Sequence, residues 1–174
     1  MDEVTNLAIA ARSGDSAAIA AFVRATQQDV WRLCALVGRR GEADDLTQET
    51  FLRVLKALPQ FRAESSAKTW VLGIARRTCA DDFRRAFRSK NLADRLRLNA
   101  LVDQRPLDQS TSGISAIVAG LDEERREAFV LTQVIGLSYE ETADVCDCPV
   151  GTIRSRVARA RQQLTQEIRD AEAI

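Results

Sequence analysis

The stretch that decides the fold of this chain is GLSYEETADVCDCPVGTIRSR, residues 136–156. Ser138 followed three residues later by Glu141 is the pattern of a capping box, which starts a helix. Pro149 suits the start of a second helix, because the first helical position needs no backbone N–H. Two helices joined by so tight a turn predict a helix-turn-helix, whose second helix enters the major groove of DNA.

The second of these helices has an apolar side and a basic side. Ile153, Val157 and Leu164 recur at helical spacing and predict the buried side. Residues 149–164 contain four arginines and no acidic residue, although the chain as a whole has a net charge of zero. A local basic stripe favours selective contact with a polyanion. The alternative to DNA contact is an amphipathic helical hairpin that only packs against the rest of the protein. The stripe predicts base contacts from Val150, Thr152, Arg154 and Ser155, and phosphate contacts from Arg156, Arg159 and Arg161.

The composition predicts an all-α protein with no catalytic or metal chemistry. The 174 residues include only 3 proline and 8 glycine, with 45% hydrophobic and 29% charged residues. This balance is typical of a globular protein, and the abundance of alanine, leucine, arginine and glutamate favours helices. The absence of histidine removes the usual general base and metal ligand. The four cysteines form no C-x-x-C pair, so we expect buried thiols, no metal and no cofactor.

The N-terminal part of the chain predicts four helices, over residues 4–12, 19–37, 45–58 and 67–88. In residues 45–58, apolar spacing predicts one side in the core, formed by Phe51, Val54, Leu55 and Leu58. A second side is polar with a leucine within it, and is either a docking surface or a plain solvated face; it contains Asp45, Gln48, Glu49, Leu52 and Lys56.

The helix predicted over residues 67–88 is strongly basic. Its six lysine and arginine residues accompany only two acids, Asp81 and Asp82. It is either a phosphate-binding face or a solvated helix. Residues 91–113 contain a further short helix, over 92–102, and a polar segment with proline, serine and glycine, so we expect a flexible linker. Two small helical domains follow, over residues 1–90 and 114–174, and the second carries the helix-turn-helix.

Three blocks of the chain resemble bacterial extracytoplasmic-function (ECF) sigma factors, in that family's order and spacing. They are DDLTQETFLR (residues 44–53), SSAKTWVLGIAR (residues 65–76) and the stretch at residues 136–156. The resemblance implies a two-domain helical initiation factor that binds core RNA polymerase and directs it to promoter DNA. The first domain would correspond to sigma region 2 and the second to sigma region 4.

The resemblance also implies roles for particular residues. Docking on the clamp helices of the largest polymerase subunit would involve Asp45, Leu46, Thr47, Gln48, Glu49 and Leu52. Recognition of the −10 element would involve Arg62, Ser65, Ser66, Lys68, Thr69, Arg76, Arg77, Arg84, Arg85 and Arg88. Recognition of the −35 element would involve Pro149, Val150, Thr152, Arg154, Ser155, Arg156 and Arg159. The linker would thread toward the active-site cleft of the polymerase.

Further expectations accompany the assignment to this family. Family members often carry asparagine where this chain has Arg77, which leaves the −10 base preference open, and Trp70 is expected in the core. With 5% aromatic residues and no net charge, the free protein should bind DNA weakly and depend on the polymerase for melting. No signal peptide or membrane span is evident, so we expect a cytoplasmic protein. Whether an anti-sigma factor binds it stays open.

Three other functions compete with this one. An autonomous helix-turn-helix repressor would have no use for the block at residues 44–53. An enzyme would need a catalytic constellation, and the chain offers neither histidine nor a glycine-rich phosphate loop. A pure protein-binding adaptor would not need the arginine stripe at residues 154–161. Transcription with purified core polymerase distinguishes all of these.

Overall fold

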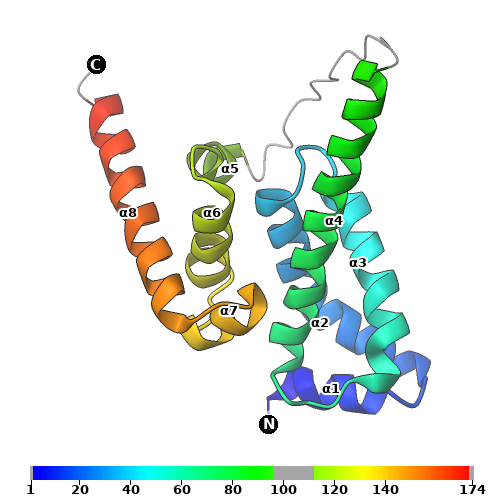
Figure 1. Ribbon diagram of the computed structural model, residues 1–174. Helices are drawn as coiled ribbons and strands as arrows, with labels where there is room; N and C mark the ends of the chain where they lie inside the picture. The colour runs from blue at the N-terminus through cyan, green and yellow to red at the C-terminus, as the bar shows by residue number, and fades with distance from the viewer. Residues whose placement is uncertain (1, 96–111, 173–174) are drawn as a thin grey trace.

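The computed structural model describes residues 2–95 and 112–172, and every regular element in these ranges is helical (Figure 1). The prediction of an all-α protein with two helical domains is confirmed. The first domain contains α1 (Glu3–Ala11), α2 (Ser16–Val37), α3 (Ala43–Ala57), a short 3₁₀ turn (Leu58–Gln60) and α4 (Ala67–Arg95). The second contains α5 (Ser112–Ala119), α6 (Glu123–Phe129), a π-helical turn (Val130–Val134), α7 (Tyr139–Cys146) and α8 (Val150–Glu172).

The core of the first domain lies where α2, α3 and α4 meet. Phe22 and Leu33 of α2 and Val54 of α3 are fully buried. The prediction that Leu55 also enters this core is wrong, because 38% of it is exposed. Leu46, Thr50 and Val54 define the buried side of α3, and Leu55 is rotated by about 100° from Val54.

The ends of α2 show how local sequence fixes the helix boundaries. The side chain of Asp15 accepts hydrogen bonds from two backbone N–H groups in the first turn. The helix runs unbroken past Thr26, whose hydroxyl donates to the carbonyl oxygen of Phe22 at 2.9 Å. At its other end, a Cβ atom at Gly38 would come within 2.5 Å of both the Cys34 carbonyl oxygen and the Leu46 side chain. Glycine at position 38 therefore allows the close approach of α3 to α2.

The helix α4 is longer than the sequence pattern indicates. It continues past the expected end at Arg88 to Arg95, and α5 already begins at Ser112. The predicted linker, residues 91–113, thus overlaps the last turn of α4 and the first residues of α5. Most of the helix expected over residues 92–102, and most of the polar segment after it, lie outside the described residues.

The second domain contains the helix-turn-helix that residues 136–156 predict. The Ser138 hydroxyl accepts from the Glu141 backbone N–H at 3.0 Å, and the Glu141 carboxylate accepts from the Ser138 N–H at 2.9 Å. This capping box is confirmed. Asp147 ends α7 in the left-handed conformation, with φ of 52°. Ile153, Val157 and Leu164 of α8 are buried as expected.

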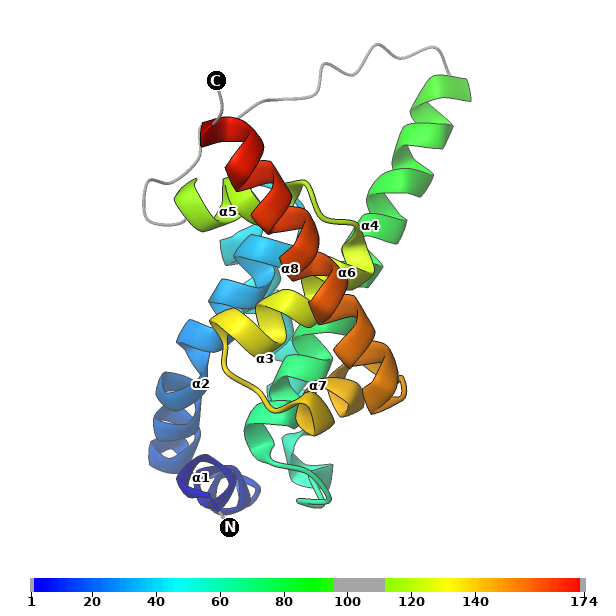
Figure 2. The same ribbon diagram turned by 90° about the vertical axis from the view of Figure 1, so that its left-hand side faces the viewer.

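The two domains lie side by side along α4. Figure 1 shows α4 standing between α3 on one side and α6 and α7 on the other. Turned by 90°, Figure 2 shows the last turns of α4 extending beyond the other helices. One side of α4 therefore completes the first domain, and another meets the second domain.

Replacement of Ser138 by alanine tests the capping box. Ser138→Ala should lower the free energy of unfolding by about 1 kcal/mol, because the Glu141 backbone N–H loses the hydroxyl that accepts its hydrogen bond. Chemical denaturation followed by circular dichroism measures this change. Thr165→Ala, in the exposed middle of α8, is the matched control and should leave stability unchanged or slightly raised. Equal effects of the two variants would contradict the capping role.

Candidate polymerase and promoter interface

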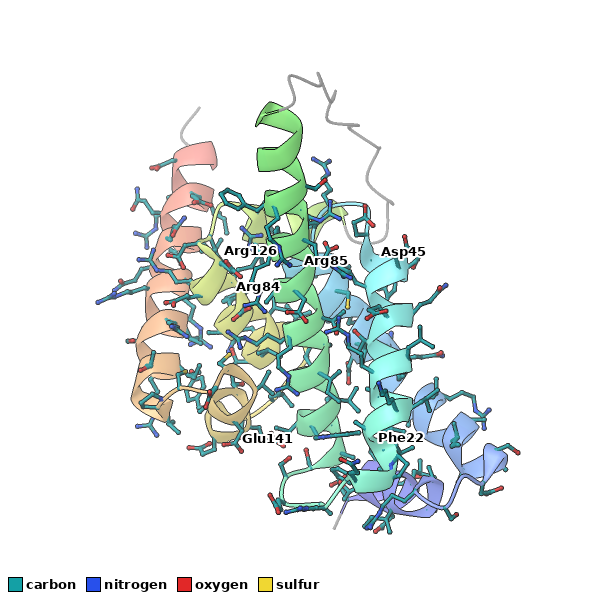
Figure 3. The ribbon with its side chains drawn as sticks, turned by 45° about the vertical axis from the view of Figure 1, so that its right-hand side comes forward. Phe22, Asp45, Arg84, Arg85, Arg126 and Glu141 are labelled. Carbon is teal, nitrogen blue, oxygen red and sulfur yellow. The ribbon has the colours of Figure 1, made fainter. Side chains whose placement is uncertain are left out.

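The exposed side of α3 carries an unusual leucine among acidic and polar residues. Asp45 and Gln48 are exposed, Glu49 is half-buried, and 66% of Leu52 is exposed. We call Asp45, Gln48, Glu49, Leu52 and the neighbouring Leu55 the α3 surface. The start of this surface, at Asp45, is labelled in Figure 3.

Two of the residues on α3 that were expected to dock, Leu46 and Thr47, make contacts within the domain instead. Leu46 is only 3% exposed and belongs to the core, where it packs against Gly38. The Thr47 hydroxyl donates to the Ala43 carbonyl oxygen at 2.7 Å, within the same helix. Both residues therefore support α3, and the side chain of Leu46 is not available at the surface.

Ion pairs between α3 and α4 neutralise the acidic residues of α4. Arg53 donates to Asp81 at 2.7 Å and to Glu49 at 2.8 Å. The hydrogen bond from Arg53, and then that from Arg84, lowers the pKa of Asp81 below its ordinary value. Asp82 is paired in the same way with Arg39. Asp81 and Asp82 thus face the domain, and the exposed residues Arg77, Arg85 and Arg88 keep the outer surface of this part of α4 basic.

The loop before α4 is held from beneath by buried contacts. Thr5 of α1 accepts from the Ala67 backbone N–H at 2.9 Å, and the rings of Phe61 and Trp70 lie 4.8 Å apart. Trp70 packs against the core, as expected. Thr69 is 4% exposed and its N–H donates to the Ser66 hydroxyl at 3.1 Å, so this pair shapes the turn. The outer side of the loop carries Arg62, with 82% of its side chain exposed, and the half-buried Ser65.

The basic side of α4 begins at Arg77 and extends along the helix. Arg77, Arg84, Arg85 and Arg88 are all exposed. Figure 3 shows Arg84 and Arg85 in the upper half of α4, the half that ends beyond the neighbouring helices. The residues lie at spacings of three, four and seven, so most of them share one side of the helix.

The other two basic residues expected to contact the −10 element, Lys68 and Arg76, contact the second domain instead. The Lys68 ammonium lies 2.8 Å from the Asp29 carboxylate and 3.3 Å from the Ile135 carbonyl oxygen. The Arg76 guanidinium donates to Glu127 at 2.7 Å. In this arrangement Lys68 and Arg76 both already have partners within the protein.

Glu127 is a buried carboxylate, with only 3% of the residue exposed. Burial raises the pKa of Glu127 above its ordinary value, against the opposing hydrogen bond and charge of Arg76. Burial also opposes the charge on Arg76, but the hydrogen bond and charge of Glu127 outweigh it and raise the pKa of Arg76. Each charge is therefore accommodated at the domain contact because the other is present.

The start of α8 presents a compact group of polar residues. Arg154, Ser155 and Arg159 are exposed, and Thr152 is half-buried. Arg156 is different, because its guanidinium lies 2.6 Å from the Glu124 carboxylate of α6 and only 17% of its side chain is exposed. Arg161 donates to Gln133 at 2.6 Å. The residues that remain outward-facing are Pro149, Arg154, Ser155 and Arg159.

Sequence reasoning missed four residues of this interface. Glu127 resembles any surface acid in sequence, since its burial comes from a helix of the other domain. Leu55 was assigned to the core by spacing, although it extends the apolar part of the α3 surface. Phe83 and Phe87 lie on the exposed side of α4, and their interruption of a basic helix is the one signal that marks them.

Neither a membrane span nor a metal site is evident in the described part of the chain. None of the helices in residues 2–95 and 112–172 is both long and apolar enough to cross a bilayer. The same residues contain no group of three or more histidine, cysteine, aspartate or glutamate side chains positioned to hold a metal ion.

Comparison with known proteins matches both domains to one class. Residues 22–89 match the family model Sigma-70 region 2, and residues 113–164 match Sigma-70, region 4. The ECF RNA polymerase sigma factor SigC of Mycobacterium tuberculosis is 48% identical over 169 residues, covering 94% of this chain and 90% of its own length. The ECF RNA polymerase sigma-E factor of Escherichia coli is 30% identical over 172 residues, covering 90% of each.

Two solved structures have the same arrangement of helices. CnrH, in complex with the cytosolic domain of CnrY, superposes with a TM-score of 0.74 and 26% identity, covering 97% of this chain and 99% of CnrH. The sigma factor RpoE of Bartonella quintana, in complex with the anti-sigma factor NepR, has a TM-score of 0.73 and 25% identity. That match covers 84% of this chain and 94% of RpoE.

A chain with a region 2 domain followed by a region 4 domain is a sigma factor of the Sigma-70 class. This chain belongs to the ECF RNA polymerase sigma factors. It is therefore a transcription initiation factor, which binds core RNA polymerase and directs promoter-specific initiation through −10 and −35 elements.

Substitution of Arg76 tests the contact between the domains. Arg76→Ala should loosen the packing of the second domain on α4, because it leaves the Glu127 carboxylate buried without its cation. Small-angle X-ray scattering of the free protein should show a larger radius of gyration. Arg77→Ala, one residue along on the exposed side of α4, is the control and should leave the radius unchanged. An unchanged radius for Arg76→Ala as well would show that the ion pair does not hold the domains together.

Proposed function

We propose that the α3 surface docks on core RNA polymerase, and that the loop 62–66 and α4 read the −10 element. The start of α8 reads the −35 element. In these terms residues 1–90 form the polymerase-binding and −10 domain, residues 91–113 the linker, and residues 114–174 the −35 domain. The observation that carries this division is the separation of surfaces: an acidic surface with exposed leucines on α3, and basic surfaces on α4 and α8.

The α3 surface has the properties of a protein contact. Leu52, at 66% exposed, and Leu55, at 38%, lie three residues apart and form an apolar centre. Asp45, Gln48 and Glu49 form a polar surround. A buried apolar centre inside a polar rim is the usual anatomy of a protein–protein interface. Glu49 pairs with Arg53, so the negative charge of the rim comes from Asp45, and it favours a basic surface on the polymerase.

The −10 element is contacted by the loop and by the basic side of α4. Arg62 and Ser65 lie on the outer side of a loop whose inner side is held by Thr5 and Phe61. A rigid loop of this kind suits the capture of an unpaired base. Arg77, Arg84, Arg85 and Arg88 continue the surface along the helix and bind phosphates.

Promoter binding requires the contact between the domains to break. Arg76 and Lys68 cannot hold Glu127 and the Ile135 carbonyl while they hold DNA. We therefore infer that the domains separate at this contact when polymerase and promoter bind. Since the similar RpoE is found in complex with an anti-sigma factor, we propose that this chain also has an anti-sigma partner. It acts in the cytoplasm and has no catalytic activity of its own.

Transcription with purified core polymerase tests the function. Addition of the chain should produce transcripts from promoters selected out of a random DNA library, and core polymerase alone should not. Leu52→Glu should weaken association with core polymerase by about tenfold or more, because it places a charge at the apolar centre of the α3 surface. Ile168→Glu, at a position of α8 with 51% of the side chain exposed, is the control. If Leu52→Glu binds core polymerase as tightly as Ile168→Glu, docking through the α3 surface is wrong.

The separate base-contacting and phosphate-contacting roles proposed for α8 predict two kinds of variant. Arg154→Ala should cost about 1–3 kcal/mol of promoter binding and relax sequence preference at one position, because the side chain reads a base edge. Arg159→Ala should weaken binding evenly across sequences and reduce the salt slope of holoenzyme binding by about one, because it holds a phosphate. Binding of both holoenzymes to a library of −35 variants measures the difference. Identical specificity profiles would contradict the separate roles.

A further inference from the structure

Two consecutive hydrogen bonds join α1 to the start of α4, although α1 precedes the residues 22–89 that match region 2. The Thr5 hydroxyl of α1 donates to the Asp2 carboxylate at 2.6 Å, and it accepts from the Ala67 backbone N–H at 2.9 Å. Thr5 is 2% exposed and Ala67 is fully buried. Figure 1 shows α1 at the end of the first domain where α4 begins. The second bond therefore connects two residues that lie 62 positions apart in the sequence.

The direction of these hydrogen bonds is fixed by the chemistry of the three groups. A hydroxyl has one proton to donate and two lone pairs with which to accept. The hydrogen bond from Thr5 lowers the pKa of Asp2 below its ordinary value, so the carboxylate stays ionised at neutral pH and only accepts. Because the Thr5 proton is committed to Asp2, the Thr5 oxygen faces the Ala67 N–H as an acceptor. Asp2 thus orients the hydroxyl that holds the start of α4.

The Ala67 N–H needs an acceptor from outside its own helix. Ala67 is the first residue of α4, and the first N–H groups of a helix have no partner within the helix. Since Ala67 is fully buried, bulk water does not replace the acceptor, and an unpaired buried N–H group is costly. A valine at position 5 would fill the same space without accepting a hydrogen bond. Close packing of α1 therefore does not by itself account for a threonine there.

The anchored residue directly follows the loop 62–66, which is proposed to read the −10 element. Before this loop, Phe61 is 3% exposed and its ring lies 4.8 Å from that of Trp70. Between the two anchors, Ala63 has a φ of 56°, a left-handed conformation that residues other than glycine rarely adopt. Such a conformation persists only where the surrounding structure imposes it. The two fixed ends therefore impose the path of the loop, and with it the positions of Arg62 and Ser65.

We propose that Thr5, oriented by Asp2, is a positioning residue for recognition of the −10 element. Thr5 is buried, so it acts through Ala67, by fixing the end of the loop 62–66, and not on DNA directly. The proposal deepens the proposed function, on which it rests. A binding site is selective only if its contact groups are held to within about 0.5 Å, and hydrogen bonds behind the site supply that restraint. Loss of the Thr5 acceptor lets the loop move, so that correct and incorrect −10 bases are bound more nearly equally.

Promoter selection by holoenzyme assembled from the full chain provides the test. One DNA library is randomised in the −10 element and a second in the −35 element, and the enrichment of each base measures discrimination at every position. Thr5→Val removes the acceptor and keeps the shape of the side chain, whereas Thr5→Ser keeps the hydroxyl. Thr26→Val is the matched control, because Thr26 is 3% exposed and its hydroxyl donates to the Phe22 carbonyl oxygen within α2. The control loses a buried hydrogen bond that does not involve the loop.

The positioning role predicts a distinct pattern across these variants. Thr5→Val should lower discrimination in the −10 library by at least about fivefold, because the lost hydrogen bond loosens the loop, and should leave the −35 library within about twofold of wild type. Thr5→Ser should restore −10 discrimination to within about twofold of wild type. Thr26→Val should leave both libraries unchanged, whatever its effect on the melting temperature. In the free protein, Thr5→Val should speed amide hydrogen exchange in residues 62–67, and Thr26→Val should not.

Several results would overturn the positioning role. A wild-type −10 profile for Thr5→Val would do so, and so would equal losses in both libraries or a loss that Thr26→Val reproduces. A loss that Thr5→Ser does not restore would place the effect in packing and not in the hydrogen bond. If Thr5→Val does not fold, Asp2→Ala decides, since Asp2 is exposed: it should lower −10 discrimination, and an unchanged −10 profile would contradict the proposal. Failure of the proposed function is recognised separately, because wild-type holoenzyme would then select no promoter from either library.

Discussion

The ion pair between Arg76 and Glu127 is the constraint on which the arrangement of the two domains depends. A carboxylate with 3% of its residue exposed is stable in its charged form only while a cation faces it. That cation comes from the other domain, at 2.7 Å. The contact is therefore conditional: each domain supplies a charge that the other needs, and separation of the domains returns both charges to water.

The helix α4 makes different contacts on several of its sides, and the contact between the domains is one of them. One side is fixed in the core of the first domain by its packing on α2 and α3. A second side carries Arg76 and Lys68 against α6 and the turn after it. A third carries Arg77, Arg84 and Arg88, and the two exposed phenylalanines continue the line of Arg76. Because we propose that promoter DNA competes with the second domain for Arg76 and Lys68, we infer that initiation needs an arrangement of the domains other than the one in the structure.

Charge separation explains how a chain with no net charge presents a surface for DNA. Asp81 and Asp82 of α4 are turned toward Arg53 and Arg39 of the same domain, which leaves Arg77, Arg85 and Arg88 facing outward. On α3, Asp45 and Glu49 lie beside the exposed Leu52. The resulting surfaces differ in sign, as two different partners require.

Local sequence predicts much of this structure, and tertiary contacts account for what it does not predict. The capping box at Ser138, the tight turn before Pro149 and the apolar line of α8 all follow from short-range spacing, and each is confirmed. The positions of Leu46 and Leu55 were not predictable from spacing, because which side of α3 is buried depends on how closely Gly38 lets α2 approach. Glu127 was missed because its burial is created by a helix distant in sequence. No single residue in the sequence indicates that α4 continues past Arg88, since the basic residues there are compatible with both a helix and a loop.

The central claim is that the domain contact made by Arg76 opens when the chain binds polymerase and promoter. Double electron–electron resonance between spin labels at Arg24→Cys on α2 and Thr165→Cys on α8, with Cys148 replaced by serine, measures it directly, because both labelled positions are exposed. The account predicts one narrow distance distribution in the free protein and a distinctly longer distance in the promoter-bound holoenzyme. An unchanged distance in a holoenzyme that is active in transcription would contradict it.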